Sequence, residues 1–347
     1  MQTVAFGRNQ KGEETSLYIF ENANHGVMKV SDHGATLVSL LVPDKEETIR
    51  DVVLGYDEAS EYEKHTCYFG ATVGRNGNRI DNARFVIEGK EYKLTPNESE
   101  HNLHSGPNGF ERVLWEVKGH TENSITFYHL SKEEEQGFPG DLEVEVTYTL
   151  TEDNAVEISY QGKADKTTVM NFTNHSYFNL GGHDSGTVKK QKLQILADSY
   201  NPVKDRKSIP TGEIAPVEGT PMDFRKMKAI GQDIEADFEQ LKFTGGYDHN
   251  YVLSETSGEM KVMARAFCEE TGIAMEASTE CCGVQLYVGN FIGDQTGKGG
   301  AAYCSRCGFC LESQFYPNAV NQENFPSPVV KAGEIFTTKT VYRFYTE

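Results

Sequence analysis

The chain has few basic residues and no long apolar segment. Its 347 residues include 33 Lys and Arg against 52 Asp and Glu, which gives a net charge of −19. A surface of this sign repels nucleic acids and anionic membranes. No apolar run approaches the ~18 residues of a membrane-spanning helix, and Met1–Arg8 lacks the charged and then apolar pattern of a secretory signal. We therefore expect a cytoplasmic protein that binds neither nucleic acid nor membranes.

The seven cysteines do not form the even framework of a disulfide-rich protein. Cys304, Cys307 and Cys310 have the close spacing of metal ligands, but no separate Cys pair or His-x3–5-His pair is present to complete a zinc site. The neighbours Cys281 and Cys282 make a poor chelating pair. We therefore predict free thiols in a reducing compartment and no bound metal.

Motifs for nucleotide binding and serine hydrolysis are also missing. No Gly-x-Gly-x-x-Gly opens a helix after a strand, no phosphate-binding loop occurs, and no Gly-x-Ser-x-Gly elbow is present. The sequence therefore argues against nucleotide cofactors and serine hydrolysis, and we expect no cofactor.

The pattern that dominates the chain is alternation of apolar and polar residues. Apolar side chains occupy every second position of 142–148 and of 156–160, with turn residues at 152–154 between them. This predicts a hairpin with one buried face, and 85–94 predicts a second hairpin around Glu88-Gly89-Lys90. With 33 glycines and closely spaced turn signals, the pattern is typical of an all-β fold, a large antiparallel β-sandwich.

Helical patterns are few and short, at 58–64, 225–230 and 233–240. The length allows two domains, but no linker, repeat or low-complexity segment divides the chain. We therefore expect residues 1–347 to form a single domain.

Five stretches are polar where the core of a strand is normally apolar, and such conflicts often mark functional sites. They are 70–80, 101–115, 169–182, 245–253 and 308–327.

Two of these stretches carry ionisable groups within predicted strands, near 169–178 and near 309–314. If 171–179 is extended, His175 and Tyr177 share a face, so His175 is either a proton carrier on a pocket floor or a structural buried histidine. If 308–314 is extended, Glu312 shares a face with Cys310, opposite Phe309 and Leu311. Glu312 is then either solvated or a pocket carboxylate with a raised pKa, suited to act as a base.

Two further polar residues allow two interpretations each. Asp248 is either a turn residue or an acceptor for hydroxyl groups. Arg79 is either part of a surface ion pair or a forked donor to adjacent hydroxyls.

Taken together and in this order, the five stretches resemble the aldose 1-epimerase (galactose mutarotase) family. The strongest segments are FTNHSYFNLGG at 172–182, GYDHNYVL at 246–253 and GFCLESQFYPNAVNQ at 308–322. The resemblance implies a galactose mutarotase-like β-sandwich with a sugar cleft. It also implies an isomerase that interconverts the α and β anomers of free hexoses such as galactose and glucose.

The resemblance further implies roles for individual residues. Glu312 corresponds to the general base and His175 to the general acid. The residues that match sugar-binding positions are Asn78, Arg79, His104, Tyr177, Asp248 and Gln285. Ser105, Gly77 and Cys282 depart from the usual pattern of the family, but none of these departures removes an ionisable group.

Three other functions remain open at this stage. A hexose-phosphate epimerase would need more basic residues near the motifs, and a glycoside hydrolase would use two carboxylates, for which Glu312 and Asp248 are the candidates. A sugar-binding protein without activity should lack Glu312 or His175. We expect a small-molecule aldose as the partner, in a monomer or weak homodimer, and we hypothesise that Cys310 borders the cleft and makes activity sensitive to thiol reagents.

Overall fold

Antiparallel strands make up most of the regular structure in the computed structural model, which describes residues 1–254 and 256–347. Within this part of the chain, the α-helices are α1 (Ala59–Lys64) and α2 (Glu239–Thr244), and 3-10 turns are short. None of the described helices has the length and hydropathy needed to cross a membrane. The predicted all-β antiparallel fold is confirmed.

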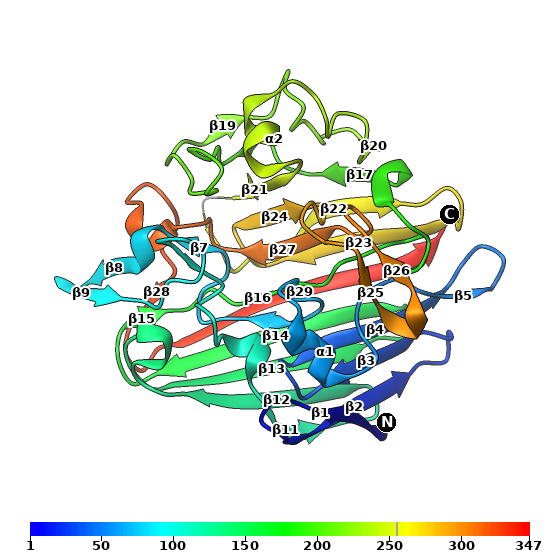
Figure 1. Ribbon diagram of the computed structural model, residues 1–347, viewed down its shortest axis with the longest axis horizontal. Coiled ribbons are helices and arrows are strands. Elements are labelled where there is room, and N and C mark those ends of the chain that lie inside the picture. Colours follow the sequence, from blue (N-terminus) through cyan, green and yellow to red (C-terminus); the bar gives the residue numbers. More distant parts are fainter. Residues whose placement is uncertain (255) are drawn as a thin grey trace.

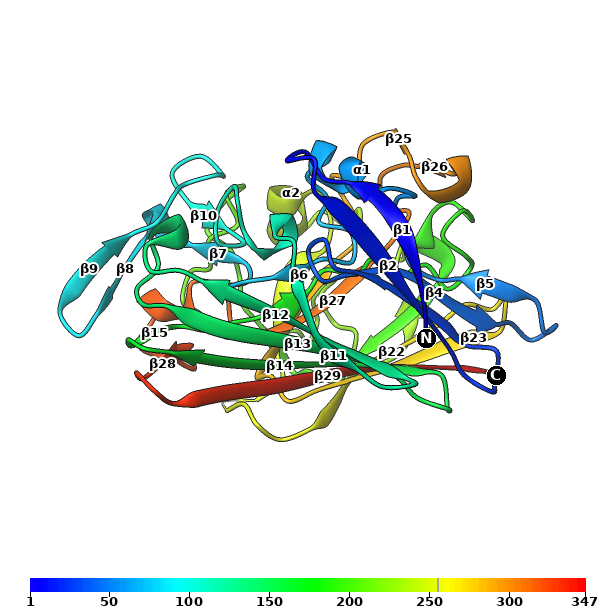
Figure 2. The same ribbon diagram turned by 90° about the horizontal axis from the view of Figure 1, so that it is seen from below.

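The largest sheet forms one layer of the molecule (Figures 1 and 2). Its strands follow the order β11 (Glu116–His120), β12 (Ser124–Ser131), β13 (Leu142–Leu150), β14 (Ala155–Ala164), β29 (Ile335–Thr346), β23 (Ile273–Thr279), β22 (Lys261–Phe267), β17 (Lys192–Ile195) and β20 (Lys228–Ala229). The predicted hairpin is β13–β14, in which Tyr148 lies opposite Ile158. It is buried on one face because its apolar residues alternate with polar ones.

Two smaller sheets form the second layer, above the large sheet in Figure 2. One has the order β1 (Gln2–Arg8), β2 (Glu14–Glu21), β3 (Val27–Ser31), β4 (Thr36–Pro43) and β5 (Ile49–Asp51). The other has the order β19 (Ala215–Pro216), β18 (Ser199–Tyr200), β21 (Asp248–Val252), β24 (Gly283–Tyr287) and β27 (Cys310–Gln314).

Five two-stranded ribbons complete the regular structure of the described residues. They are β6 (Thr72–Val73) with β16 (Thr173–Asn174), β7 (Arg79–Ile80) with β10 (Asn102–Leu103), β8 (Arg84–Ile87) with β9 (Lys90–Lys93), β15 (Thr168–Val169) with β28 (Val329–Val330), and β25 (Gln295–Thr296) with β26 (Ala302–Tyr303). The predicted hairpin at 85–94 is β8–β9.

One hydrophobic core fills the space between the layers. It contains Leu40 of β4, Val144 of β13, Leu286 of β24 and Tyr342 of β29, so all three large sheets contribute to it. Burial of apolar surface is the main force that holds such layers together. We propose on this basis that residues 1–347 form one domain.

The helix predictions were partly wrong. The pattern at 58–64 is helix α1, but 225–230 is turn and strand β20, and the pattern at 233–240 becomes helical only from Glu239. At 225–230, a carboxylate oxygen of Asp223 accepts a hydrogen bond from the backbone N–H of Arg225 at 3.1 Å. The same oxygen accepts a second hydrogen bond from the Arg225 side chain. Such local side-chain bonds favour a turn over a helix.

A buried ion pair fixes the 3-10 turn at 298–300 to the sheet that contains β4 and β5. The Lys298 ammonium donates to the Val38 carbonyl at 2.7 Å, to the Ser39 hydroxyl at 3.1 Å and to the Asp51 carboxylate at 2.7 Å. Burial lowers the pKa of Lys298, and the charge of Asp51 opposes this shift. The contacts of Lys298 therefore join the 3-10 turn to β4 and β5.

Replacement of Lys298 by Ala should destabilise the protein by about 3–5 kcal/mol, because Asp51 would then be buried without a countercharge. Lys11→Ala, at an exposed position, should change stability by less than about 0.5 kcal/mol. Urea unfolding of both variants tests this. A loss below about 1 kcal/mol for Lys298→Ala would show that the pair is not important for stability.

Candidate active site

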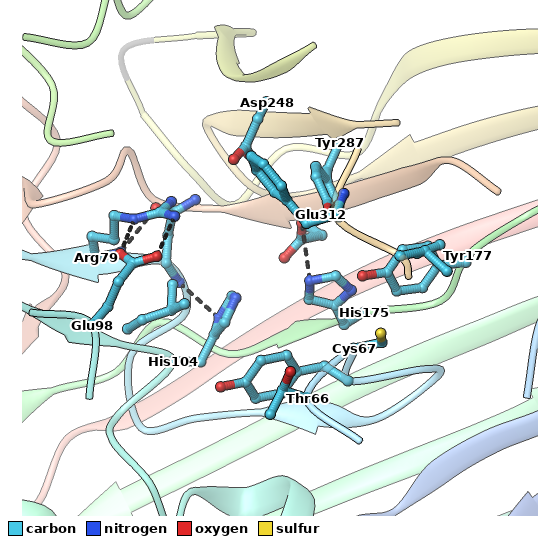
Figure 3. A pocket seen from close by; sticks show the side chains of 15 residues that line it. Thr66, Cys67, Arg79, Glu98, His104, His175, Tyr177, Asp248, Tyr287 and Glu312 are labelled. Atoms are coloured by element: carbon cyan, nitrogen blue, oxygen red, sulfur yellow. Dashed lines mark hydrogen bonds and ion pairs between the residues drawn. The ribbon is translucent and has the colours of Figure 1, made fainter. Parts of the chain in front are cut away.

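A cavity of about 190 Å³ brings together most of the residues that the sequence singled out (Figure 3). Sites for drug-sized ligands usually measure roughly 300–1,000 Å³, so this cavity suits a smaller molecule. The predicted residues that line it are Asn78, Arg79, His104, His175, Tyr177, Asp248 and Glu312. Gln285 is the one predicted residue that is not part of this lining.

Strand register explains how distant segments meet at the cavity. In the sheet of β21, β24 and β27, Glu312 lies opposite Gln285, and Asp248 lies opposite Tyr287. In the ribbon of β7 and β10, Arg79 lies opposite Leu103, which places His104 beside the start of β7. Side chains far apart in the sequence therefore converge because their strands are neighbours.

His175 follows a strand much shorter than predicted. A continuous strand over 169–178 is wrong, since only Thr168–Val169 and Thr173–Asn174 are strands here. The backbone of His175 instead bonds to Ala71 and Gly70, each at 3.0 Å. The Asn174 amide donates to the Gly70 carbonyl at 2.9 Å, so bonds to this loop replace those of a regular ladder.

Two tyrosines hold the ring of His175. It stacks on Tyr68 and Tyr177, with centroid distances of 5.7 and 5.0 Å. Stacking of this kind restricts the orientation of the ring. One nitrogen, Nε2, is consequently fixed on the side of Glu312.

Glu312 and His175 form a buried pair. Glu312 Oε1 lies 3.6 Å from His175 Nε2 (Figure 3), and Glu312 Oε2 is buried with no hydrogen-bond partner among the described residues. Burial raises the pKa of Glu312, and Asp248 adds to this effect. Burial lowers the pKa of His175 to about 4. Both shifts favour neutral forms, so the pair holds one proton over a wide pH range.

His104 is held in one tautomer. The backbone N–H of Asn78 donates to His104 Nδ1 at 3.1 Å, and the backbone N–H of His104 donates to the Asn78 carbonyl at 3.0 Å. Burial lowers the pKa of His104 well below its usual value, helped by His175 and Arg79. The ring is therefore neutral with its proton on Nε2, so Nε2 is a hydrogen-bond donor.

The same three side chains are the one group of possible metal ligands among residues 1–254 and 256–347. The ligand atoms of His104, His175 and Glu312 lie within 4.8 Å of one another. However, His104 would have to coordinate through Nε2, which carries the proton in the tautomer that Asn78 selects. The donor set fits hydrogen bonding and proton transfer better than coordination. That the protein binds no metal stays a prediction.

The far side of the cavity carries polar groups that bind hydroxyls well. Asp248 accepts a hydrogen bond from Gln285 Nε2 at 2.6 Å, so Gln285 orients Asp248 from behind. Burial raises the pKa of Asp248, and the nearby Arg79 opposes the shift. Arg79 itself forms an ion pair with Glu98, at 2.5 Å from Nε and 2.9 Å from Nη2.

Sequence reasoning missed several lining residues. They are Thr66, Cys67, Tyr68, Glu98, Leu103, Tyr287, Phe291 and Ile292. Glu98 and Leu103 border or lie within the polar stretch at 101–115, and Tyr287 follows Gln285 by two positions, so proximity to a motif was an available signal. Cys67 and Tyr68 lie in the loop between α1 and β6, just before the polar stretch at 70–80, so the same signal was available for them.

Comparisons with known proteins identify the family of the chain. The family model described as aldose 1-epimerase matches residues 16–343. The chain belongs to the aldose 1-epimerase family. A galactose mutarotase of Sus scrofa is 43% identical over 312 residues, which cover 90% of this chain and 89% of that protein. An aldose 1-epimerase of Escherichia coli strain K12 is 36% identical over 338 residues, 97% of each chain.

The fold comparison gives the same family. The crystal structure of an aldose epimerase homologue from C. elegans superposes with a TM-score of 0.86 at 33% identity, and covers 96% of this chain and 99% of that one. The predicted family, the galactose mutarotase-like fold and the enzyme class, an isomerase of the aldose 1-epimerase type, are confirmed.

In this aldose 1-epimerase family member, Cys310 lies behind the cavity. Its Sγ is 3.5 Å from His175 Nδ1, and the side chain is fully buried. Burial raises the pKa of the thiol, which makes it a poor nucleophile. Burial raises the pKa of the Cys67 thiol as well, but Cys67 is only half-buried and lines the cavity, so its accessibility makes it the better candidate for sensitivity to thiol reagents.

Iodoacetamide should therefore modify Cys67 before Cys310 and block the cavity. Inactivation of Cys67→Ser, measured relative to its own starting rate, should be at least about tenfold slower than that of the wild type. Cys304→Ser, at a half-buried position outside the cavity lining, serves as the matched control. Loss of activity while mass spectrometry finds Cys67 unmodified would refute this assignment.

Proposed function

We propose that this member of the aldose 1-epimerase family interconverts the α and β anomers of free hexoses such as galactose and glucose. The observation that carries the proposal is the buried pair of Glu312 and His175, whose side chains approach to 3.6 Å in a small polar cavity. Anomer exchange needs one base and one acid at a single site, and this pair provides both. Family membership supports the same reaction.

The ring opens in a single balanced step. Glu312 takes the proton of the C1 hydroxyl while His175 gives a proton to the ring oxygen, so the bond from C1 to the ring oxygen breaks and C1 becomes an aldehyde carbon. Rotation about the C1–C2 bond presents the other face of the aldehyde. The ring then closes as the two proton transfers run in reverse, which returns the pair to its starting state.

The resting pair has the right number of protons for this step. One proton shared between Glu312 and His175 gives either two neutral groups or a carboxylate beside an imidazolium, and the second form is the reactive one. The unpartnered Glu312 Oε2 is available to accept the C1 proton. The Nε2–H of His104 would stabilise negative charge on the ring oxygen as the bond breaks.

The remaining polar groups would hold the sugar while C1 turns. Asp248 would accept hydrogen bonds from hydroxyls, and Asn78 and Arg79 would hold others. Gln285 donates a hydrogen bond to Asp248 and would complete the set of groups that bind the sugar hydroxyls. Tyr177 supports the ring of His175 and offers an aromatic surface on the same side of the cavity.

We also propose the setting in which the enzyme works. The seven cysteines are all free, which supports a reducing compartment such as the cytoplasm. We propose a monomer or weak homodimer with no requirement for a cofactor, and a neutral aldose as the partner.

Glu312→Gln and His175→Asn should each lower the mutarotation rate on α-glucose and α-galactose by at least about 10². Each variant removes a proton acceptor or donor while the shape of the side chain is nearly kept. Polarimetry measures the rate, and Glu269→Gln, at an exposed position, is the control. A near wild-type rate in either active-site variant would refute the assigned roles. Release of sugar from an aryl glycoside would instead favour a glycoside hydrolase.

The rate should depend on pH with a bell shape. Below the pKa of His175, about 4, the pair takes a second proton and Glu312 can accept none. Above the raised pKa of Glu312, the pair has lost its one proton and His175 has none to give. In His175→Asn the alkaline limb should vanish, because only ionisation of Glu312 still matters. Initial rates across the pH range test this, and a flat wild-type profile would contradict it.

A further inference from the structure

Arg79 is the one Lys or Arg among the described residues that line the cavity, and it is already paired. Glu98 binds the guanidinium through two contacts, Nε to Oε2 at 2.5 Å and Nη2 to Oε1 at 2.9 Å (Figure 3). The Arg79 side chain is 11% exposed and that of Glu98 34%. A fork-to-fork pair of this kind is among the strongest side-chain hydrogen bonds.

Glu98 occupies one of the two forks of Arg79, the one formed by Nε and Nη2. Guanidinium groups bind phosphates and carboxylates through two parallel N–H donors and through their positive charge. The two Nη1 hydrogens and the second Nη2 hydrogen stay available for hydroxyl groups, but the carboxylate of Glu98 already offsets the charge that would attract an anion. An anion that approached Arg79 would also face the carboxyl groups of Asp248 and Glu312, which line the same cavity.

The loop that carries Glu98 is itself fixed. The Asn97 side chain exchanges hydrogen bonds with the backbone of Leu103, at 2.8 and 2.9 Å. The backbones of Glu98 and His101 bond to each other at 3.0 and 3.2 Å. Glu98 is therefore directed at Arg79 before any ligand arrives. It also forms part of the wall shared with a neighbouring cavity of about 390 Å³.

We propose that Glu98 is a positioning residue that determines specificity: it holds Arg79 for neutral hydroxyls and excludes aldoses that carry an anionic substituent. The inference rests on the proposed function, since it concerns the sugars that the same site accepts. Glu98 lines the cavity of about 190 Å³ beside Arg79, so a substituent that approaches Arg79 also meets the charge of Glu98. At the low effective dielectric of such a site, one negative charge has a large effect on a second one.

Glu98→Gln tests the proposal because it keeps the size of the side chain and removes its charge. Exchange between anomers is measured by NMR for glucose and for glucose 6-phosphate at constant ionic strength. The ratio of kcat/KM for the phosphate to that for glucose should rise at least about tenfold, mainly through KM for the phosphate. The rise should shrink at high salt because salt screens exposed charges.

Three variants control the experiment. Glu100→Gln lies in the same loop, but its carboxylate pairs with Lys207 and it does not line the cavity, so the ratio should stay within about twofold. Glu98→Ala should raise the ratio as Glu98→Gln does, whereas Glu98→Asp, which keeps the charge, should return it toward the wild-type value.

The results distinguish a failure of the proposed function from a failure of the role proposed for Glu98. If the wild type does not exchange the anomers of glucose, the proposed function fails, and this inference fails with it. If the wild type is active but the ratio stays within about twofold in both Glu98→Gln and Glu98→Ala, only the role of Glu98 is refuted.

Discussion

The carboxyl group of Glu312 lies in a cavity that little water reaches, next to a histidine that is equally buried. An ionised carboxylate in such a place is costly unless it is paired. One of its oxygens has no partner in the described part of the chain. The arrangement of the site depends on this constraint. The unpartnered oxygen of Glu312 is the atom to which a substrate hydroxyl would donate a hydrogen bond. The shared proton keeps the pair neutral until then.

The surrounding structure keeps this unfavourable arrangement in place. Two stacked tyrosines fix the ring of His175, and the Asn78 backbone selects the tautomer of His104. Neither the tyrosine rings nor the Asn78 backbone carries a charge. They therefore orient His175 and His104 without stabilising the ionised form of either ring. The core between the layers supplies the burial energy that offsets the buried polar positions at the cavity.

Charge on the far side of the cavity is also balanced locally. An unpaired Arg79 would attract anions, but Glu98 binds its Nε and Nη2 donors and Asp248 lies near it. The strongly negative net charge of the chain and the ion pair of Arg79 with Glu98 therefore have the same effect on charged ligands. Both disfavour anionic ligands, one at long range and the other at contact distance.

Much of the architecture could be predicted because it depends on local patterns. Alternation at 142–148 and 156–160 by itself determines the β13–β14 hairpin, and motif order determines the family and seven of the lining residues. The predicted helix at 233–240 and the predicted strand at 169–178 are wrong, because the structure has helix only from Glu239 and only two short strands in the second segment. In the second segment, bonds such as that from the Asn174 amide to the Gly70 carbonyl replace a regular ladder. Only the tertiary structure decided that Glu98 holds Arg79, that Gln285 stands behind Asp248 and that Cys67 rather than Cys310 faces the cavity. These are contacts between segments remote in sequence, and strand register and packing, which no local pattern encodes, bring them together.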